Sequence, residues 1–235
     1  MVELDPHEII LFDDEAILVV NKPYGLLSLQ DGYDKNLPYL STVLEPAFGR
    51  IWMVHRLDRD TSGVMVVART QEAHRSLNRQ FQNRQVIKIY HALVVGSVAW
   101  QTMRVNQPLR KDGDRQHRTV IDPQRGKPAV TDFRLIEQFN GFALIEARPY
   151  TGYTHQIRAH LGFISLAIAA DPLYGDGKPV CISPSPSAVS PKILLSRLGL
   201  HACSLSFSHP VSNTEMTFQA AYPTDLAETL AFLRA

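Results

Sequence analysis

The chain has 235 residues, of which 45% are hydrophobic and 20% are charged. This composition is typical of a globular protein and excludes disordered and fibrous chains. No apolar run reaches the roughly 20 residues of a membrane helix, and the acidic segment 1–7 lacks the pattern of a secretory signal. Two cysteines, Cys181 and Cys203, are too few for a disulfide framework or a thiolate zinc site. We therefore expect a cytoplasmic protein.

The net charge is only +1, but the charges are unevenly distributed along the chain. Residues 50–158 hold 18 Lys and Arg against 9 Asp and Glu, and the rest of the chain is acidic. Such a basic middle segment favours a surface that meets a polyanion such as RNA or DNA. The alternative is that this stretch of sequence does not form one surface patch.

The first half of the chain predicts four short elements. Residues 9–20 are two apolar runs around an acidic turn and predict two strands, and residues 64–68 predict a buried strand. Thr70 can cap a helix over 71–84, which carries one apolar stripe. Residues 86–95 alternate between two faces, as a strand does, with Lys88 and Tyr90 on one side.

The second half predicts hairpins and two further helices. Residues 110–118 are polar and indicate an exposed loop or hairpin, and Asn140-Gly141 between two alternating runs predicts a tight hairpin. A helix is expected from Thr154 to about Gly162. The Ser- and Pro-rich segment 182–191 predicts a mobile loop. A strand pair at about 200–220 and a C-terminal helix complete the chain.

Strands outnumber helices and are often joined by hairpins. We therefore expect an α+β fold, a single domain over 1–235 built on a largely antiparallel mixed sheet flanked by helices and loops. The sequence lacks the motifs of serine hydrolases, phosphate-loop enzymes and dinucleotide-binding enzymes. His155 and His160 lie five residues apart and do not match the i, i+4 spacing of a helical zinc site, so we expect no metal.

Residues 55–63 form the densest polar cluster, with two aspartates, two arginines and one histidine. One interpretation is a solvated charged turn. Against it, the cluster lies between the apolar segments 51–54 and 64–68, which would anchor its backbone near the core. Mixed charge also suits a site in which guanidinium groups keep a carboxylate ionised.

A second polar cluster, residues 152–158, lies at the expected start of a helix. Free backbone N–H groups at such a helix end favour a phosphate or a carboxylate. His155 and Arg158 are three residues apart and would share one face of the helix. An ordinary capped helix with a solvated Arg158 is the alternative.

Together these segments resemble the RluA family of pseudouridine synthases. Residues 55–63 match that family's HRLDRDTSG motif. The resemblance extends in order through nearly the whole chain. Its further parts are Asn21-Lys22-Pro23 with Gly25-Leu26-Leu27, Lys88-x-Tyr90-x-Ala92, Gly126-Lys127-Pro128-Ala129-x-Thr131, residues 152–161, Asp171-Pro172-x-Tyr174-Gly175, Leu200-His201-Ala202 and His209-Pro210.

The resemblance implies an isomerase that detaches uracil from ribose in RNA, rotates it and rejoins it through carbon 5, without a cofactor or a metal. Asp58 matches the catalytic aspartate, Tyr90 the tyrosine that packs against the target base, and Arg158 the arginine that pairs with the aspartate. Breaking a glycosidic bond needs a carboxylate at the sugar, as a nucleophile or as a base that removes a ribose proton, and both roles stay open for Asp58.

The expected partner is structured RNA, a ribosomal or transfer RNA stem-loop whose uridine is flipped into a central basic cleft. Tyr153 stands where the family usually has Arg. We expect a monomer without an N-terminal RNA-binding domain. A catalytically silent RNA-binding module on the same scaffold is the alternative. The candidate substrate-binding residues are His55, Arg56, Arg59, Thr61, Lys88, His155 and Gln156.

Overall fold

The computed structural model describes residues 4–182 and 192–235. The segment expected to form a mobile loop therefore lies, apart from Ile182, outside the described residues. The backbone divides into two compact units: unit 1 comprises Met1–Lys88 and Ala202–Ala221, and unit 2 comprises Ile89–His201 and Tyr222–Ala235. The single domain expected over 1–235 stays a prediction.

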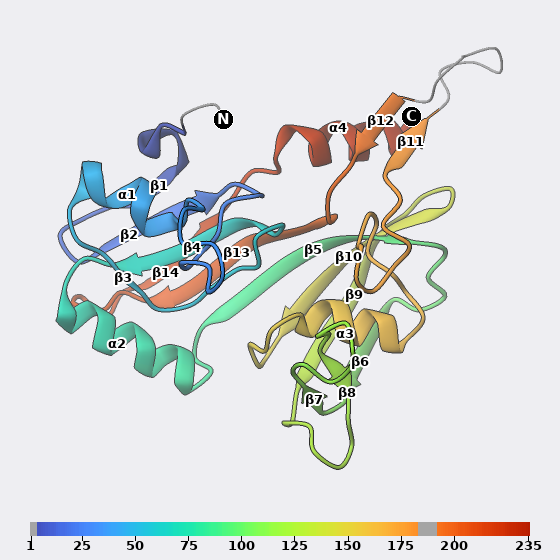
Figure 1. The fold of residues 1–235 in the computed structure, drawn as a ribbon, viewed down its shortest axis with the longest axis horizontal. Coiled ribbons are helices and arrows are strands. Elements are labelled where there is room, and N and C mark those ends of the chain that lie inside the picture. The colour runs from blue at the N-terminus through green and yellow to red at the C-terminus, as the bar shows by residue number, and fades with distance from the viewer. Residues whose placement is uncertain (1–3, 183–191) are drawn as a thin grey trace. The chain divides into compact units, whose positions relative to one another are not determined.

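Unit 1 contains antiparallel strands, two α-helices and one 3-10 turn (Figure 1). Two of its strands, β5 and β13, continue into unit 2 at one end. Its elements are η1 (Pro6–Ile9), β1 (Ile10–Asp13), β2 (Ile17–Lys22), α1 (Leu40–Phe48), β3 (Trp52–Met53), β4 (Ser62–Ala68), α2 (Gln71–Gln82), the start of β5 (Ile87–Val95), most of β13 (Leu200–Ser208) and β14 (Glu215–Gln219).

The core of unit 1 forms where apolar strands meet one helix. β2 pairs antiparallel with both β1 and β4, and its residues 17–20 are fully buried. α2 packs Ala73 and Leu77 against this sheet, and the Thr70 hydroxyl accepts the Ala73 N–H at 3.1 Å as the helix cap. The predicted strands in 9–20 and 64–68 and the capped helix are confirmed, although the helix ends at Gln82.

Unit 2 contains a second set of antiparallel strands and two α-helices. Its elements are most of β5, β6 (Thr102–Asn106), β7 (Leu109–Arg110), β8 (Val120–Ile121), β9 (Val130–Gln138), β10 (Phe142–Pro149), α3 (Gln156–Phe163), β11 (Val180–Ile182), β12 (Lys192–Leu195) and α4 (Thr224–Arg234).

The sheet of unit 2 runs β5-β10-β9-β6, and a helix covers each face. α3 packs on the face that carries Ile145, whereas α4 packs on the face that carries Leu144. The β9–β10 hairpin turns at Gly141, whose φ of 76° is the left-handed conformation that glycine adopts without strain. The predicted hairpin, both helices and the largely antiparallel α+β fold are confirmed.

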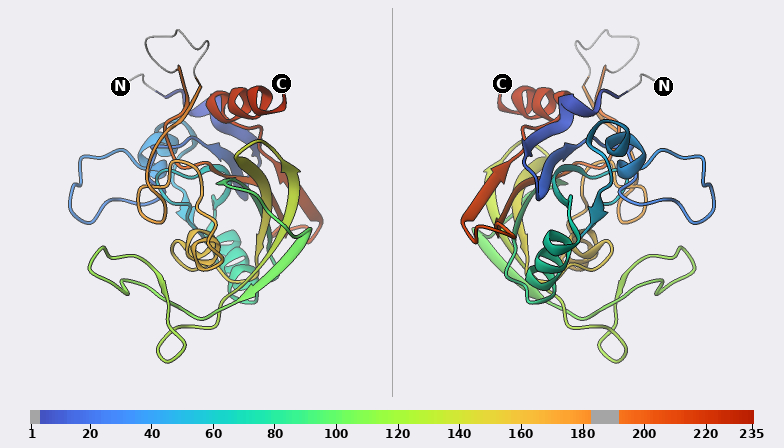
Figure 2. Two further views of the ribbon diagram at one scale, coloured as in Figure 1. Left: turned by 90° about the vertical axis from the view of Figure 1, so that its right-hand side faces the viewer. Right: turned by 90° about the vertical axis from the view of Figure 1, so that its left-hand side faces the viewer.

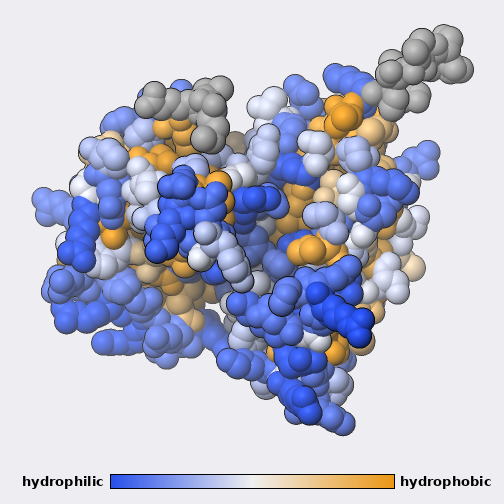
Figure 3. Space-filling model, viewed as in Figure 1, coloured by the Kyte–Doolittle hydropathy of each residue, from blue (hydrophilic) through white to orange (hydrophobic). Residues whose placement is uncertain are grey.

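Residues 107–128 form an arm between β6 and β9. Its short strands β7 and β8 pair antiparallel, so the segment predicted as an exposed loop or hairpin is a hairpin. Figure 2 shows the arm, in green, extending away from the strands of its own unit. In Figure 3 mostly hydrophilic side chains cover it. None of the helices in residues 4–182 and 192–235 has the length and apolar character needed to cross a membrane.

Candidate active site

Asp58 lies in unit 1, in the loop that leads into β4, and hydrogen bonds fix the backbone on both sides of it. The buried Ser28 hydroxyl donates to the Leu57 carbonyl at 2.7 Å and accepts the Leu57 N–H at 3.0 Å. On the other side the Thr61 N–H donates to the Asp58 carbonyl at 3.1 Å and closes a turn. The backbone on both sides of Asp58 is therefore fixed by hydrogen bonds, and the catalytic role of Asp58 stays a prediction.

A fully buried lysine secures the same turn. The Lys22 ammonium donates to the carbonyls of Pro23 at 2.8 Å, Leu26 at 2.7 Å and Arg59 at 3.2 Å. The Arg59 carbonyl also accepts the Gly25 N–H at 2.8 Å. The role of Lys22 was not predicted, although its position at the end of an apolar strand and before Pro23 was a signal in the sequence. Its role is to tie loop 23–26 to the turn after Asp58.

Gly63, the last residue of the polar cluster, lies directly against the backbone of Ala202 in β13. Its φ is +121°, and a Cβ at this position would lie 2.1 Å from the carbonyl oxygen of Ala202 in β13. No side chain fits in that space. Glycine at position 63 therefore allows β4, which follows the Asp58 loop, to pack against the backbone of β13.

His55 points into unit 1. Its Nε2 accepts the Val66 N–H at 3.1 Å, and its ring stacks on Phe81 with centroids 4.6 Å apart. Burial, aided by the charge of Lys88, lowers the pKa of His55 to about 3, so the imidazole is neutral at physiological pH. These contacts attach the start of the motif to β4 and α2. The predicted contact of His55 with substrate stays a prediction.

The other predicted residues of the cluster differ in exposure. Arg56 and Arg59 are exposed, and the Arg59 Nε lies 3.3 Å from an Asp60 carboxylate oxygen. Thr61 is buried. The two arginines can reach a solvent-side anion, and the substrate contacts of all three residues stay predictions.

Lys88 and Tyr90 lie two residues apart on β5, so their side chains project to the same face of that strand. Burial, aided by the charge of Arg84, lowers the pKa of Lys88 to about 8. Tyr90 is half-buried against the core of unit 2 and pairs with Ala147 of β10. The strand that sequence alternation predicts is confirmed, and the roles of the two side chains stay predictions.

Arg158 is buried in α3 and forms a two-point ion pair with Asp171. Its Nε and Nη2 donate to the two carboxylate oxygens at 2.7 and 2.6 Å, and Asp171 is fully buried. Asp171 also accepts the N–H groups of Leu173 and Tyr174. Burial acts to raise the pKa of Asp171, but these bonds outweigh it and lower that pKa. The alternative of a solvated Arg158 is therefore wrong, and its pairing with Asp58 stays a prediction.

Tyr174 connects this ion pair to the arm. The Arg158 guanidinium lies over its ring, 5.0 Å from the centroid, and its hydroxyl accepts the Thr119 N–H at 2.8 Å and donates to the Thr119 carbonyl at 3.0 Å. The same hydroxyl lies 3.3 Å from Nδ1 of His155, which has a left-handed φ of 54°. No role was predicted for Tyr174, which belongs to the segment Asp171-Pro172-x-Tyr174-Gly175 that resembles a family motif. The predicted contact of His155 with substrate stays a prediction.

Gln156 uses its whole amide inside unit 2. Its oxygen accepts from the Thr151 hydroxyl and the Tyr153 N–H, and its nitrogen donates to the Val130 carbonyl and the Thr131 hydroxyl. These bonds join the start of α3 to β9, and the predicted contact of Gln156 with substrate stays a prediction.

His160 belongs to the same network and is fully buried. Its Nδ1 bonds to the Thr131 hydroxyl at 2.9 Å, and its Nε2 donates to the Gln107 carbonyl at 3.0 Å.

Within the described part of the chain, no three His, Cys, Asp or Glu side chains converge to hold a metal ion.

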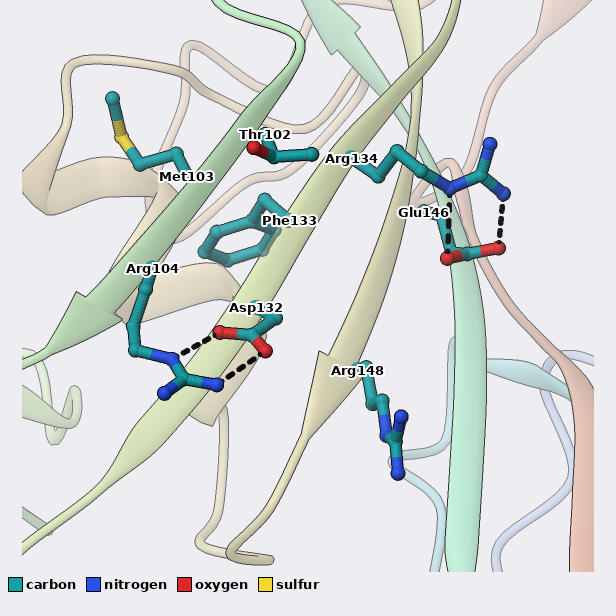
Figure 4. Close-up of a pocket in the computed structure, with 8 residues that line it drawn as sticks. All are labelled: Thr102, Met103, Arg104, Asp132, Phe133, Arg134, Glu146 and Arg148. Atoms are coloured by element: carbon teal, nitrogen blue, oxygen red, sulfur yellow. Dashed lines mark hydrogen bonds and ion pairs between the residues drawn. The ribbon is translucent and has the colours of Figure 1, made fainter.

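A cavity of about 360 Å³ lies on the sheet of unit 2, over β6, β9 and β10 (Figure 4). Two of its arginines bind carboxylates across neighbouring strands: Arg104 with Asp132, and Arg134 with Glu146. The carboxylates of Asp132 and Glu146 therefore neutralise the charges of these two arginines. Figure 4 shows Arg148 apart from both pairs.

Comparison with known proteins gives consistent results. A family model described as RNA pseudouridylate synthase matches residues 16–162. Ribosomal large subunit pseudouridine synthase D of Neisseria meningitidis is 37% identical over 96% of this chain, and the chain spans 61% of that protein. The synthase of the same name from Zymomonas mobilis is 36% identical, with 92% of this chain and 70% of that protein covered.

Two solved structures share the fold. The structure titled human RNA pseudouridylate synthase domain containing 4 has a TM-score of 0.75 and 26% identity, and covers 97% of this chain and 94% of that one. Human RNA pseudouridylate synthase domain containing 1 has a TM-score of 0.72 and 25% identity, with the same coverage. The chain therefore belongs to the RNA pseudouridylate synthase family, whose isomerisation of uridine in RNA is the activity that its sequence motifs predict.

Proposed function

We propose that this chain converts uridine to pseudouridine in ribosomal RNA, with Asp58 acting at the sugar of the target nucleotide. In this isomerisation the bond from ribose C1′ to uracil N1 breaks and a bond from C1′ to C5 forms. The C5 hydrogen leaves as a proton and N1 gains one, so the reaction consumes no co-reactant. Both routes open to Asp58, attack on C1′ and removal of a ribose proton, need an ionised carboxylate.

The observation that carries the proposal is the fixed backbone around Asp58. Two buried groups, the Ser28 hydroxyl and the Lys22 ammonium, bind the residues on either side of it. A solvated charged turn has no need of buried donors of this kind. A reacting group held in one place lowers the entropic cost of reaching the transition state.

In the proposal, Tyr90 supplies an aromatic face for the flipped base and Arg158 keeps Asp58 oriented. Arg158 is suited to positioning because Asp171 fixes its guanidinium at two points. Lys88, on the same face of β5 as Tyr90, would bring positive charge near the RNA.

The test is the release of tritium from RNA labelled at C5 of uridine, measured in a single turnover. Asp58→Asn and Asp58→Ala should abolish release while the protein stays folded. Asp60→Asn is the matched control, because Asp60 lies in the same turn, half-exposed beside Arg59. Turnover by Asp58→Asn, or equal loss in Asp60→Asn, would contradict the proposal.

The names of the relatives support large-subunit ribosomal RNA as the substrate rather than transfer RNA. They give no support to a catalytically silent RNA-binding module. We expect a monomer acting in the cytoplasm on a stem-loop uridine, which must leave its stack to react. Mapping pseudouridines in cellular RNA with and without the gene identifies the site, and modification lost only from transfer RNA would refute the ribosomal assignment.

A further inference from the structure

A second cavity, of about 340 Å³, lies at the base of the arm, beside the residues that lead into α3. We call it the arm cavity. Four of the side chains that line it are cationic, namely Arg110, Lys111, Arg125 and Lys127, and none is a carboxylate. Its volume is within the range of pockets that hold small ligands or parts of larger ones. The lining therefore favours an anionic group.

Two of these cations are available to a ligand without breaking an ion pair. Arg110 is bound to Asp122 at 2.6 Å, and Lys111 lies 3.7 Å from Asp112. Arg125 and Lys127 are exposed and have no ion pair or side-chain hydrogen bond among the described residues. An anion entering the arm cavity would meet these two side chains first.

The backbone that carries Arg125 and Lys127 is rigid. The Asp122 carboxylate accepts the Arg125 N–H at 2.9 Å, and Lys127 pairs with Leu109 through both its N–H and its carbonyl. Between them, Gly126 is so tightly enclosed that a Cβ would lie 2.4 Å from the Asp122 carbonyl oxygen. Cations fixed in this way lose little backbone entropy when a ligand binds.

Tyr153 forms an aromatic wall of the arm cavity. Its half-buried ring packs on the apolar cluster of Leu109, Ala129 and Ala159. The hydroxyl of Tyr153 has no hydrogen-bond partner among the described residues, whereas its N–H donates to Gln156 at 3.2 Å. An aromatic ring supported by the core beside unpaired cations is the arrangement that stacks a nucleic-acid base.

The cavity of Figure 4 does not offer the same chemistry. There Arg104 and Arg134 are each bound by a carboxylate, so an entering phosphate would lie beside Asp132 and Glu146. The arm cavity has free cations and no carboxylate in its lining. The anion-binding chemistry of unit 2 therefore favours the arm.

We infer that the arm cavity binds one phosphodiester group of the substrate RNA through Arg125 and Lys127 and stacks the neighbouring base on Tyr153. The inference rests on the proposed function, because the ligand is the RNA that the enzyme modifies. Phosphate contacts of this kind fix the position of an RNA without reading its sequence. The arm cavity is thus a site that positions RNA away from the reacting uridine.

The phosphate contact is tested by the double variant Arg125→Met/Lys127→Met. Binding of a ribosomal stem-loop RNA is measured across a salt series, with Asp58→Asn added so that the RNA stays unmodified. The dissociation constant should rise at least about tenfold at low salt, and the slope of log affinity against log salt should fall by about 1 to 2. The charge-matched control, Lys178→Met/Lys192→Met, removes two exposed lysines of the same unit and should change neither.

The stacking contact is tested by Tyr153→Leu against Tyr153→Phe. Leucine keeps the apolar packing but lacks an aromatic face, so affinity should fall about 5- to 150-fold. The Tyr153→Phe variant keeps the aromatic face and should bind as the parent does, because the lost hydroxyl makes no hydrogen bond to any residue in 4–182 or 192–235. Equal affinities of the two variants would overturn the stacking contact, and an unchanged salt slope in the double variant would overturn the phosphate contact.

The two proposals fail in distinguishable ways. If the wild-type chain releases no tritium, the proposed reaction fails, and the binding series still shows whether RNA occupies the arm cavity. If the wild type is active and the arm variants bind RNA normally, only the arm cavity is refuted. With both proposals right, the wild-type chain releases tritium and the arm variants bind the RNA more weakly than their Asp58→Asn parent.

Discussion

Asp171→Ala should be among the most destabilising substitutions in unit 2. It removes the two carboxylate oxygens that accept from the guanidinium of Arg158, a residue that is only 6% exposed. Removing one partner of a buried pair costs about 3–5 kcal/mol, a large part of the 5–15 kcal/mol that stabilises a typical domain. The N–H groups of Leu173 and Tyr174 lose an acceptor as well, which places the expected cost at the upper end.

The measurement is urea unfolding at pH 7, followed by circular dichroism, for Asp171→Ala, Arg158→Met and the double variant. If the pair acts as one unit, the double variant should lose much less than the sum of the single losses, because no unpaired charge remains. Asp176→Ala is the control, since its ion pair with Lys178 is exposed and its loss should leave the midpoint unchanged.

The pH dependence of the same loss follows from the lowered pKa of Asp171. A carboxylate whose pKa is lower in the folded chain contributes stability above its unfolded value of about 4 and loses it as the pH falls through the folded value. The difference between wild type and Asp171→Ala should therefore be constant from pH 5 to 8 and shrink below pH 4. A loss under about 1 kcal/mol at pH 7, or strict additivity with Arg158→Met, would refute the reasoning.

Two further predictions concern unit 1. Gly63→Ala should prevent folding, because its Cβ would lie 2.1 Å from the Ala202 carbonyl oxygen. Gly32→Ala is the control and should fold, because a Cβ there would meet no atom within 4 Å. The soluble yield and the circular dichroism spectra of the two variants are compared. Because the pKa of His55 is about 3 in the folded chain against an ordinary value of 6.5, the folded state binds fewer protons between these values and stability rises with pH. The wild-type free energy of unfolding should therefore rise from pH 5 to pH 7, and His55→Asn should reduce this rise by about 1–2 kcal/mol. An equal rise in both proteins would contradict the lowered pKa of His55.

Elements with strong local signals could be predicted from the sequence. The Thr70 cap and the apolar stripe that follows it define α2, and Asn140-Gly141 defines the β9–β10 hairpin, because both signals act within a few residues. α1 was not predicted, because it carries Pro46 in its interior, where proline disfavours a helix. That helix is stabilised by the burial of Leu40 and Leu44, which only the tertiary structure reveals.

The sequence indicates candidate site residues, but it does not indicate the hydrogen-bond and ion-pair partners that the structure gives them. Arg158 was predicted to pair with Asp58, which stays a prediction, and nothing local in the sequence indicates its ion pair with Asp171, 13 residues later. Gln156 stood in a polar motif and was predicted to contact substrate, which stays a prediction, but the hydrogen bonds by which its amide joins α3 to β9 were not predicted. A pattern of residue types does not indicate whether a polar side chain serves a ligand or the backbone.

Segment 21–28 and the motif at 55–63 form one structural unit within unit 1, although they lie far apart in the sequence. Segment 21–28 donates from Lys22, Gly25 and Ser28 to carbonyl groups of the motif at 55–63. The Ser28 hydroxyl also accepts the Leu57 N–H of that motif. Lys22 is conspicuous because a buried ammonium is costly unless carbonyl groups surround it. Since one of its three carbonyls is that of Arg59, the free energy of burying the charge depends on the turn beside Asp58 being in place. The position of the proposed catalytic carboxylate is thus coupled to the folding of the whole unit, and a search for reactive side chains alone would overlook the residues that determine it.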